Sequence, residues 1–173
     1  MGDDLNGAND NLIFTRLFKN PSWFESARKE EITARLDVFK DYMEKDQLDI
    51  NSALILIKSS ITNLTFSQNG KRAKNIIRKV LSPPQERSIW GWKEPNTQIY
   101  IQEISDYFPH LKYIHIVRHG LDMAFSNNKQ QLKNWGYKYG IHLDGKETEN
   151  EVSYKQMEYW MRSTEGAIHK GQT

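Results

Sequence analysis

Two residues suited to phosphate chemistry, Arg118 and Ser126, flank a glycine-containing turn in the middle of the chain. Residues 113–117 are β-branched and aromatic, which is typical of a buried parallel strand. Gly120 follows in the turn, and the sequence from Asp122 onward predicts a helix with this acid in its first turn. The segment is therefore expected to fold as strand, tight turn and helix.

Anion binding is the chemistry that this arrangement favours. The free N–H groups and the dipole of a helix start both point at such a turn, and the guanidinium of Arg118 is a donor fork that matches phosphate. Ser126 is expected about one and a half turns into the helix, where its hydroxyl would reach the same anion. The alternative is a plain strand-to-helix connection with an exposed arginine and a helical serine.

The segment IVRHGLDMAFS, with seven residues between Arg118 and Ser126, resembles the 3′-phosphate-binding segment of sulfotransferases. These enzymes use 3′-phosphoadenosine 5′-phosphosulfate (PAPS). The upstream run WGWKEP at 90–95 resembles a second segment of that family, and the run NWG at 134–136 resembles its bacterial members. The resemblance is good over residues 90–136, weaker over 9–23 and thin elsewhere. It implies a sulfotransferase that moves a sulfuryl group from PAPS to a hydroxyl or amine acceptor, with no metal.

The resemblance also assigns roles to Lys93 and Glu94. It implies that Lys93 contacts the sulfuryl group or the bridging oxygen of PAPS, and that Arg118 and Ser126 contact the same donor. The alternative is that Lys93 is a surface lysine at the end of a strand. Some family members carry a histidine two residues after this lysine, where this chain has Pro95. Glu94 is the candidate base, although alternation along a strand would direct it away from Lys93.

Three histidines, at 110, 115 and 119, are expected to be structural or solvent-facing. The family normally opens with a strand and a Gly-rich loop, rich in Ser and Thr, that holds the phosphosulfate. Residues 1–20 contain no such loop. We therefore expect a fragment of a longer enzyme or a truncated product, poorly active alone and with an incomplete sheet. The general base would then lie outside this chain if it is not Glu94.

Composition excludes several classes of site and partner. The 173 residues contain no cysteine, which excludes disulfides, thiolate metal ligands and a cysteine nucleophile. No stretch is apolar for long enough to span a membrane, and the N-terminus has no signal-like region, so a cytoplasmic protein is expected. The expected partners are the nucleotide donor and a small-molecule, sugar or lipid acceptor.

The charge distribution is more informative than the net charge of +2. Residues 71–142 carry twelve Lys or Arg against five Asp or Glu, a balance that would attract a multiply charged nucleotide. A solvated basic face is the alternative. Nucleic acid is a weaker alternative partner, because no RNA-binding aromatic signature or zinc-finger spacing is present.

The elements predict a single domain with an α/β fold. Residues 1–82 are expected to be mainly helical, including a basic helix at 71–81 with Ile76, Ile77, Val80 and Leu81 inward and its charges in solvent. Residues 83–136 are expected to form a βαβ half-site, with strands at 88–92 and 112–117, a helix at 99–108, and both Lys93 and Arg118 at one sheet edge. Residues 137–173 are expected to form a loop and a C-terminal helix. The predicted fold is a parallel βαβ core of the P-loop-like sulfotransferase kind with flanking helices.

Two other functions fit parts of this pattern. The first is a non-catalytic remnant that keeps the nucleotide-phosphate site. The second is a relative of the P-loop kinases, which would need a Gly-x-x-x-x-Gly-Lys-Ser/Thr loop that the sequence lacks.

Overall fold

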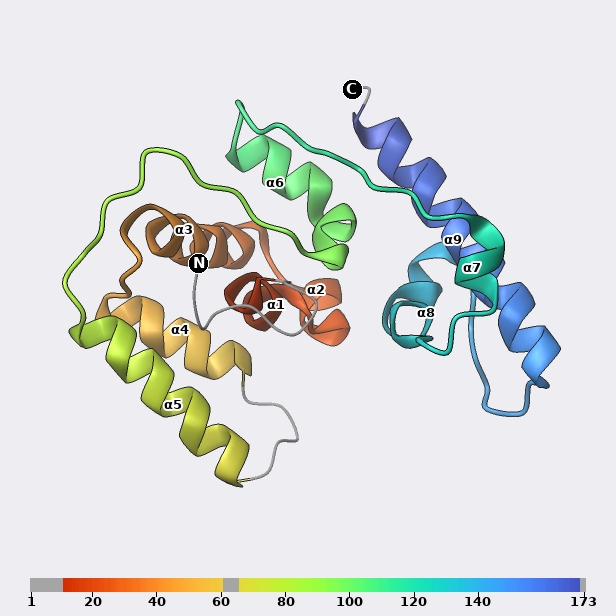
Figure 1. Ribbon diagram of the computed structural model, residues 1–173, viewed down its shortest axis with the longest axis horizontal. Coiled ribbons are helices and arrows are strands. Elements are labelled where there is room, and N and C mark those ends of the chain that lie inside the picture. The colour runs from red at the N-terminus through yellow and green to blue at the C-terminus, as the bar shows by residue number, and fades with distance from the viewer. Residues whose placement is uncertain (1–10, 61–65, 172–173) are drawn as a thin grey trace. The chain divides into compact units, whose positions relative to one another are not determined.

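The computed structural model describes residues 11–60 and 66–171 and divides into two compact units (Figure 1). The first unit is Met1–Thr97 and the second is Gln98–Thr173. The boundary falls inside residues 83–136, which the sequence assigned to one half-site. The single-domain organisation stays a prediction.

The first unit is built from a set of packed helices. Its helices are α1 (Leu12–Phe18), α2 (Pro21–Ser26), α3 (Lys29–Lys45), α4 (Ile50–Ser60) and α5 (Phe66–Leu81). Helix α1 packs on α3 and α4, and α4 packs on α5. Phe14, Leu17 and Phe39 are fully buried where α1 meets α3, so the core of this unit is centred on α1.

Local signals in the sequence explain where these helices begin and end. Asn20 caps α2, because its side chain accepts a hydrogen bond from the Trp23 amide at 3.2 Å, and Pro21 occupies the first helical position. Helix α3 ends at Asp46, which adopts the left-handed conformation with φ of 51°. Asn69 and Gly70 form a sequence pattern that predicts a helix end, but this prediction is wrong, since α5 continues through these residues to Leu81.

An extended segment then returns from α5 along the end of α3. The amides of Gln85 and Arg87 donate to the carbonyls of Lys45 and Glu44, each at 2.7 Å. Further along, the rings of Trp90 and Trp92 lie edge-on to Phe39, with centroids 6.2 and 5.1 Å away. This contact with a helical core holds the segment that carries Lys93.

The second unit is organised around one long helix, α9 (Glu149–Gly171). It also contains α6 (Ile101–Tyr107), α7 (Gly120–Ala124), α8 (Gln130–Trp135) and the 3₁₀ turn η2 (Gly136–Tyr139), while the 3₁₀ turn η1 (Pro95–Tyr100) spans the unit boundary. All of α6, α7, α8 and η2 pack on α9. Trp135 is fully buried, and its ring meets that of Tyr100 edge-on at 5.8 Å.

The predicted parallel βαβ core is wrong: no sheet is present in the two described stretches, which are predominantly helical. Residues 88–92 and 112–117 form neither a helix nor a strand. In the first of these segments the tryptophans pack on helices. In the second, Ile114 and Ile116 are 83% and 81% exposed, where a central strand would bury them. An α/β P-loop-like fold is therefore not the architecture of this chain.

Candidate functional site

The extended segment that leads to Arg118 exposes one row of side chains and partly buries the other. Tyr113 and His115 are half-buried on one side and share a 2.8 Å hydrogen bond between the Tyr113 hydroxyl and His115 Nδ1. Burial lowers the pKa of His115 and raises that of Tyr113. This contact fixes the direction in which the chain reaches Arg118.

Arg118 stands at the end of this segment with an exposed side chain. Its guanidinium makes no ion pair or side-chain hydrogen bond within residues 11–60 and 66–171. A guanidinium in this state keeps all its donors available to an anion from solution. Its five N–H groups could hold two phosphate oxygens at once.

The turn after Arg118 is closed by His119, whose Nδ1 accepts a hydrogen bond from the Leu121 amide at 3.3 Å. His119 is therefore the N-cap of α7, and this structural role agrees with its expected one. Helix α7 has only five residues, so its dipole adds little to anion binding.

Ser126 lies in the loop after α7, not inside a continuing helix as predicted. Its hydroxyl oxygen accepts a hydrogen bond from the Asn128 amide at 3.2 Å, which leaves the hydroxyl proton available to a ligand. The chain therefore presents Arg118 and Ser126 from the two ends of a short helix. An anion bound at this segment would therefore be held by hydrogen bonds from loop amides and side chains more than by a helix dipole.

Gly120 brings this turn into close contact with α9. A Cβ added at this buried position would lie 2.8 Å from the ring of Trp160. Contacts this short force one of the two groups to move. The glycine therefore sets how closely the turn after Arg118 packs on the long helix.

We expect Gly120→Ala to destabilise the second unit by about 1–3 kcal/mol, the usual cost of overpacking. The free energy of unfolding from urea titration would measure it. Gly91→Ala is the matched control, because nothing lies within 4 Å of a Cβ at that position. Adding Trp160→Leu should restore part of the loss. If Gly120→Ala and Gly91→Ala changed the free energy of unfolding equally, the contact with the Trp160 ring would not be the cause of the destabilisation.

Lys93 and Glu94 belong to the first unit, where their neighbours hold them differently. Lys93 is exposed, and its carbonyl accepts the Asn11 amide at 2.8 Å. Glu94 is 8% exposed; one carboxylate oxygen accepts the Thr15 hydroxyl and the other accepts the amide and side chain of Asn96. Hydrogen bonds of this kind are typical of a buried carboxylate that holds its own loop in place, which is the role that they indicate for Glu94. No strand is present at these residues, so the alternation that was expected to direct Glu94 away from Lys93 does not apply.

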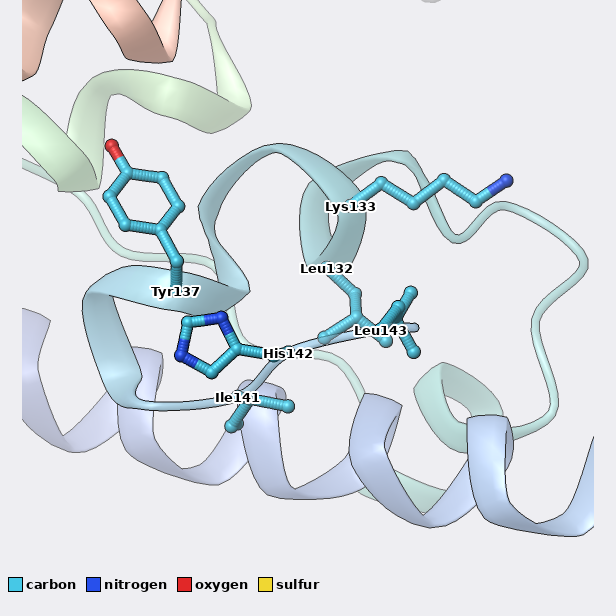
Figure 2. Close-up of a pocket in the computed structure, with 6 residues that line it drawn as sticks. All are labelled: Leu132, Lys133, Tyr137, Ile141, His142 and Leu143. Atoms are coloured by element: carbon cyan, nitrogen blue, oxygen red, sulfur yellow. The ribbon is translucent and has the colours of Figure 1, made fainter. Parts of the chain in front are cut away.

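A cavity of about 250 Å³ lies in the second unit, and the sequence did not predict it (Figure 2). It is lined by a mixture of aliphatic and nitrogen-bearing side chains: Leu132, Lys133, Tyr137, Ile141, His142 and Leu143. The rings of Tyr137 and His142 lie near each other, whereas Lys133 extends away from them. An imidazole beside an apolar wall could accept a proton from a small hydroxyl compound. In the sequence, the only sign of this cavity was His142, a histidine within a glycine-containing polar stretch.

The loop that carries His142 is anchored at several points. The Ile141 amide donates to the Gly136 carbonyl at 2.9 Å, and Lys155 on α9 donates to the His142 carbonyl at 2.9 Å. The same ammonium pairs with Glu147 at 2.7 Å, and this pair, with nearby loop amides, lowers the pKa of Glu147 to about 2. The loop is thus tied to α9.

The described residues contain neither a metal-binding cluster nor a membrane-spanning helix. No cluster of three or more His, Asp or Glu side chains that could hold a metal ion occurs among them. None of their helices is long and apolar enough to cross a membrane.

Comparison with known proteins gives one match. A family model described as "Sulfotransferase family" matches residues 7–173, which is nearly the whole chain. No curated protein and no solved structure matches. The match includes the segment around Arg118 and Ser126 and the run that contains Lys93.

Proposed function

This chain belongs to the sulfotransferase family, and on that premise we propose that it takes part in sulfuryl transfer from PAPS to a hydroxyl or amine acceptor. The exposed guanidinium of Arg118, without an ion pair in the described residues, carries the proposal. We assign it, with the Ser126 hydroxyl, to the 3′-phosphate of the donor. The match to the family supports sulfuryl transfer in general, whereas the donor and the acceptor are our assignment.

The charge around this segment fits a phosphate. Residues 107–143 contain five Lys or Arg and a single acid, Asp122. Lys129 in the same loop donates to the Ala124 carbonyl at 2.6 Å and so adds positive charge beside Ser126. A doubly charged phosphate would meet little repulsion here, and each charge-assisted hydrogen bond is worth about 1.5–3 kcal/mol.

The reaction breaks the S–O bond between the sulfuryl group and the phosphate of PAPS. It forms a new S–O bond to a hydroxyl acceptor or a new S–N bond to an amine acceptor. Negative charge grows on the phosphate that leaves, and the acceptor's proton passes to a base. We assign Lys93 to the neutralisation of this charge. The contacts of Glu94 with Thr15 and Asn96 favour a positioning role for Glu94 over that of the base.

Titration with adenosine 3′,5′-bisphosphate, compared with 5′-AMP, tests the donor assignment. We expect the bisphosphate to bind with a dissociation constant on the order of 0.1–1 mM, which is about −4 to −5.5 kcal/mol, and 5′-AMP to bind much more weakly. Calorimetry or NMR shifts would measure both. Equal binding of the two nucleotides would contradict a site for the 3′-phosphate.

A second measurement separates catalysis from binding alone. Incubation with PAPS and a panel of hydroxyl and amine acceptors should transfer the sulfuryl group if the chain is catalytic. Transfer at a low rate would agree with the poor activity expected of this chain alone, whereas binding of the bisphosphate with no detectable transfer would favour the non-catalytic remnant. The kinase alternative has no support, because its nucleotide loop is absent from the sequence.

A further inference from the structure

Large apolar side chains are exposed on each of two neighbouring helices of the first unit. Ile50 and Leu54 on α4 are 70% and 49% exposed, and Ile77 and Leu81 on α5 are 56% and 78% exposed. The prediction that Ile77 and Leu81 point inward is therefore wrong. With Ile57 of α4, these residues define what we call the α4–α5 face.

The spacing of these residues places them in a stripe on each helix. Positions 50, 54 and 57 share one side of α4, and positions 77 and 81 share one side of α5. The helices pack against each other in antiparallel directions (Figure 1). The Leu48 amide donates to the Lys79 carbonyl at 3.3 Å, which ties the start of α4 to the end of α5. Ile50 therefore lies at the same end of the helix pair as Leu81.

The charge of this helix pair has one sign. Residues 50–81 contain six Lys or Arg and no Asp or Glu. Lys79 is used internally, in a 2.6 Å ion pair with Asp46. Lys58 on α4 and Lys74 on α5 are exposed on the same helices as the apolar stripes. The α4–α5 face thus combines exposed aliphatic side chains with positive charge that no acid of these helices offsets.

We propose that the α4–α5 face binds the surface of a bilayer containing anionic lipids. Apolar side chains would enter the headgroup region while lysines meet lipid phosphates and carboxylates, which is how basic amphipathic helices bind membranes. Such binding is interfacial and needs no spanning helix. This inference does not depend on the sulfotransferase assignment.

The structure favours a bilayer over a protein that wraps around a basic helix. A neighbouring side of α5 is already engaged, because Ile76, about 100° around the helix from Ile77, is only 4% exposed. A partner that encloses a single helix would have to pull α5 away from α4. A bilayer surface needs access to one side only, and it covers both helices at once.

Co-sedimentation with lipid vesicles tests the proposal on the full chain. We expect at least about tenfold stronger binding to phosphatidylcholine vesicles with about 30% phosphatidylserine than to pure phosphatidylcholine, and a loss of this preference at high salt. Lys58→Glu with Lys74→Glu should lower binding to the anionic vesicles by about tenfold or more, since each basic residue adds about 1 kcal/mol. Ile77→Ser with Leu81→Ser should lower binding to a similar extent.

Matched controls lie outside the α4–α5 face. Ile89→Ser and Ile114→Ser remove side chains that are 90% and 83% exposed, and Lys29→Glu reverses another exposed charge. These variants should bind vesicles as the unchanged protein does. Circular dichroism would verify that all variants fold.

Three outcomes would overturn the proposal. The first is no preference for anionic vesicles at low salt. The second is equal loss of binding in face and control variants. The third is self-association that Leu81→Ser abolishes while vesicle binding is unchanged, because the face would then bind a second copy of the chain.

Discussion

Arg118→Ala is expected to abolish detectable binding of adenosine 3′,5′-bisphosphate. The guanidinium is the one side chain of the segment that offers a charged donor fork, and the short α7 provides little dipole to replace it. A loss of about 1.5–3 kcal/mol weakens binding by about ten- to one-hundred-fold, which moves a dissociation constant on the order of 0.1–1 mM to about 1–100 mM, at or beyond the limit of calorimetric titration. Calorimetric titration of both proteins would show the difference.

Two further variants make this result specific. Ser126→Ala should weaken binding less, because a neutral hydroxyl contributes about 0.5–1.5 kcal/mol. Lys112→Ala, at the other end of the same extended segment, is the control for a general loss of positive charge and should change binding little. If Arg118→Ala and Lys112→Ala had equal effects, the positive charge of the region rather than a built site would explain binding.

Phe14→Ala is expected to lower the free energy of unfolding of the first unit by about 3–5 kcal/mol. The ring is fully buried and lies 4.7, 5.2 and 5.8 Å from the rings of Phe18, Phe39 and Trp92. Its removal would leave a large cavity that these rings could fill only in part. Urea titration followed by tryptophan fluorescence would report both the stability and the surroundings of Trp92.

The control for this prediction is an exposed aliphatic residue in the same unit. Leu81→Ala removes a side chain that is 78% exposed, and should change the unfolding free energy by less than about 0.5 kcal/mol. A change below about 1 kcal/mol for Phe14→Ala would mean that the aromatic cluster is not the core of this unit. Since Trp92 adjoins Lys93, loss of the ring would also loosen the loop that presents this lysine.

The segment from Arg118 to Ser126 shows how a family can be recognised correctly while the expected structure of the segment is wrong. The types and order of Arg118, Gly120 and Ser126 pointed to the sulfotransferase family, and the family match confirms this. The structure replaces the expected long helix with a helix of five residues and a loop. It also gives Gly120 a packing role against Trp160 that no pattern in the sequence indicated.

What the sequence determined by itself is local. Asn20 and Pro21 mark the start of α2, and Asp46, in the left-handed conformation, marks the end of α3. Such features depend on side chains that bond to backbone groups a few residues away. Periodic apolar residues likewise identified the helical character of most of residues 11–60 and 66–82.

Only the tertiary structure decided whether extended segments become a sheet and which apolar residues are covered. A run such as residues 113–117 has the composition of a strand, but a strand exists only where another supplies the hydrogen-bonding partner. The exposure of Ile77 and Leu81 follows in the same way from how α4 and α5 pack, and not from the period of α5. Both depend on contacts between residues distant in the sequence, which the local pattern of side chains does not contain.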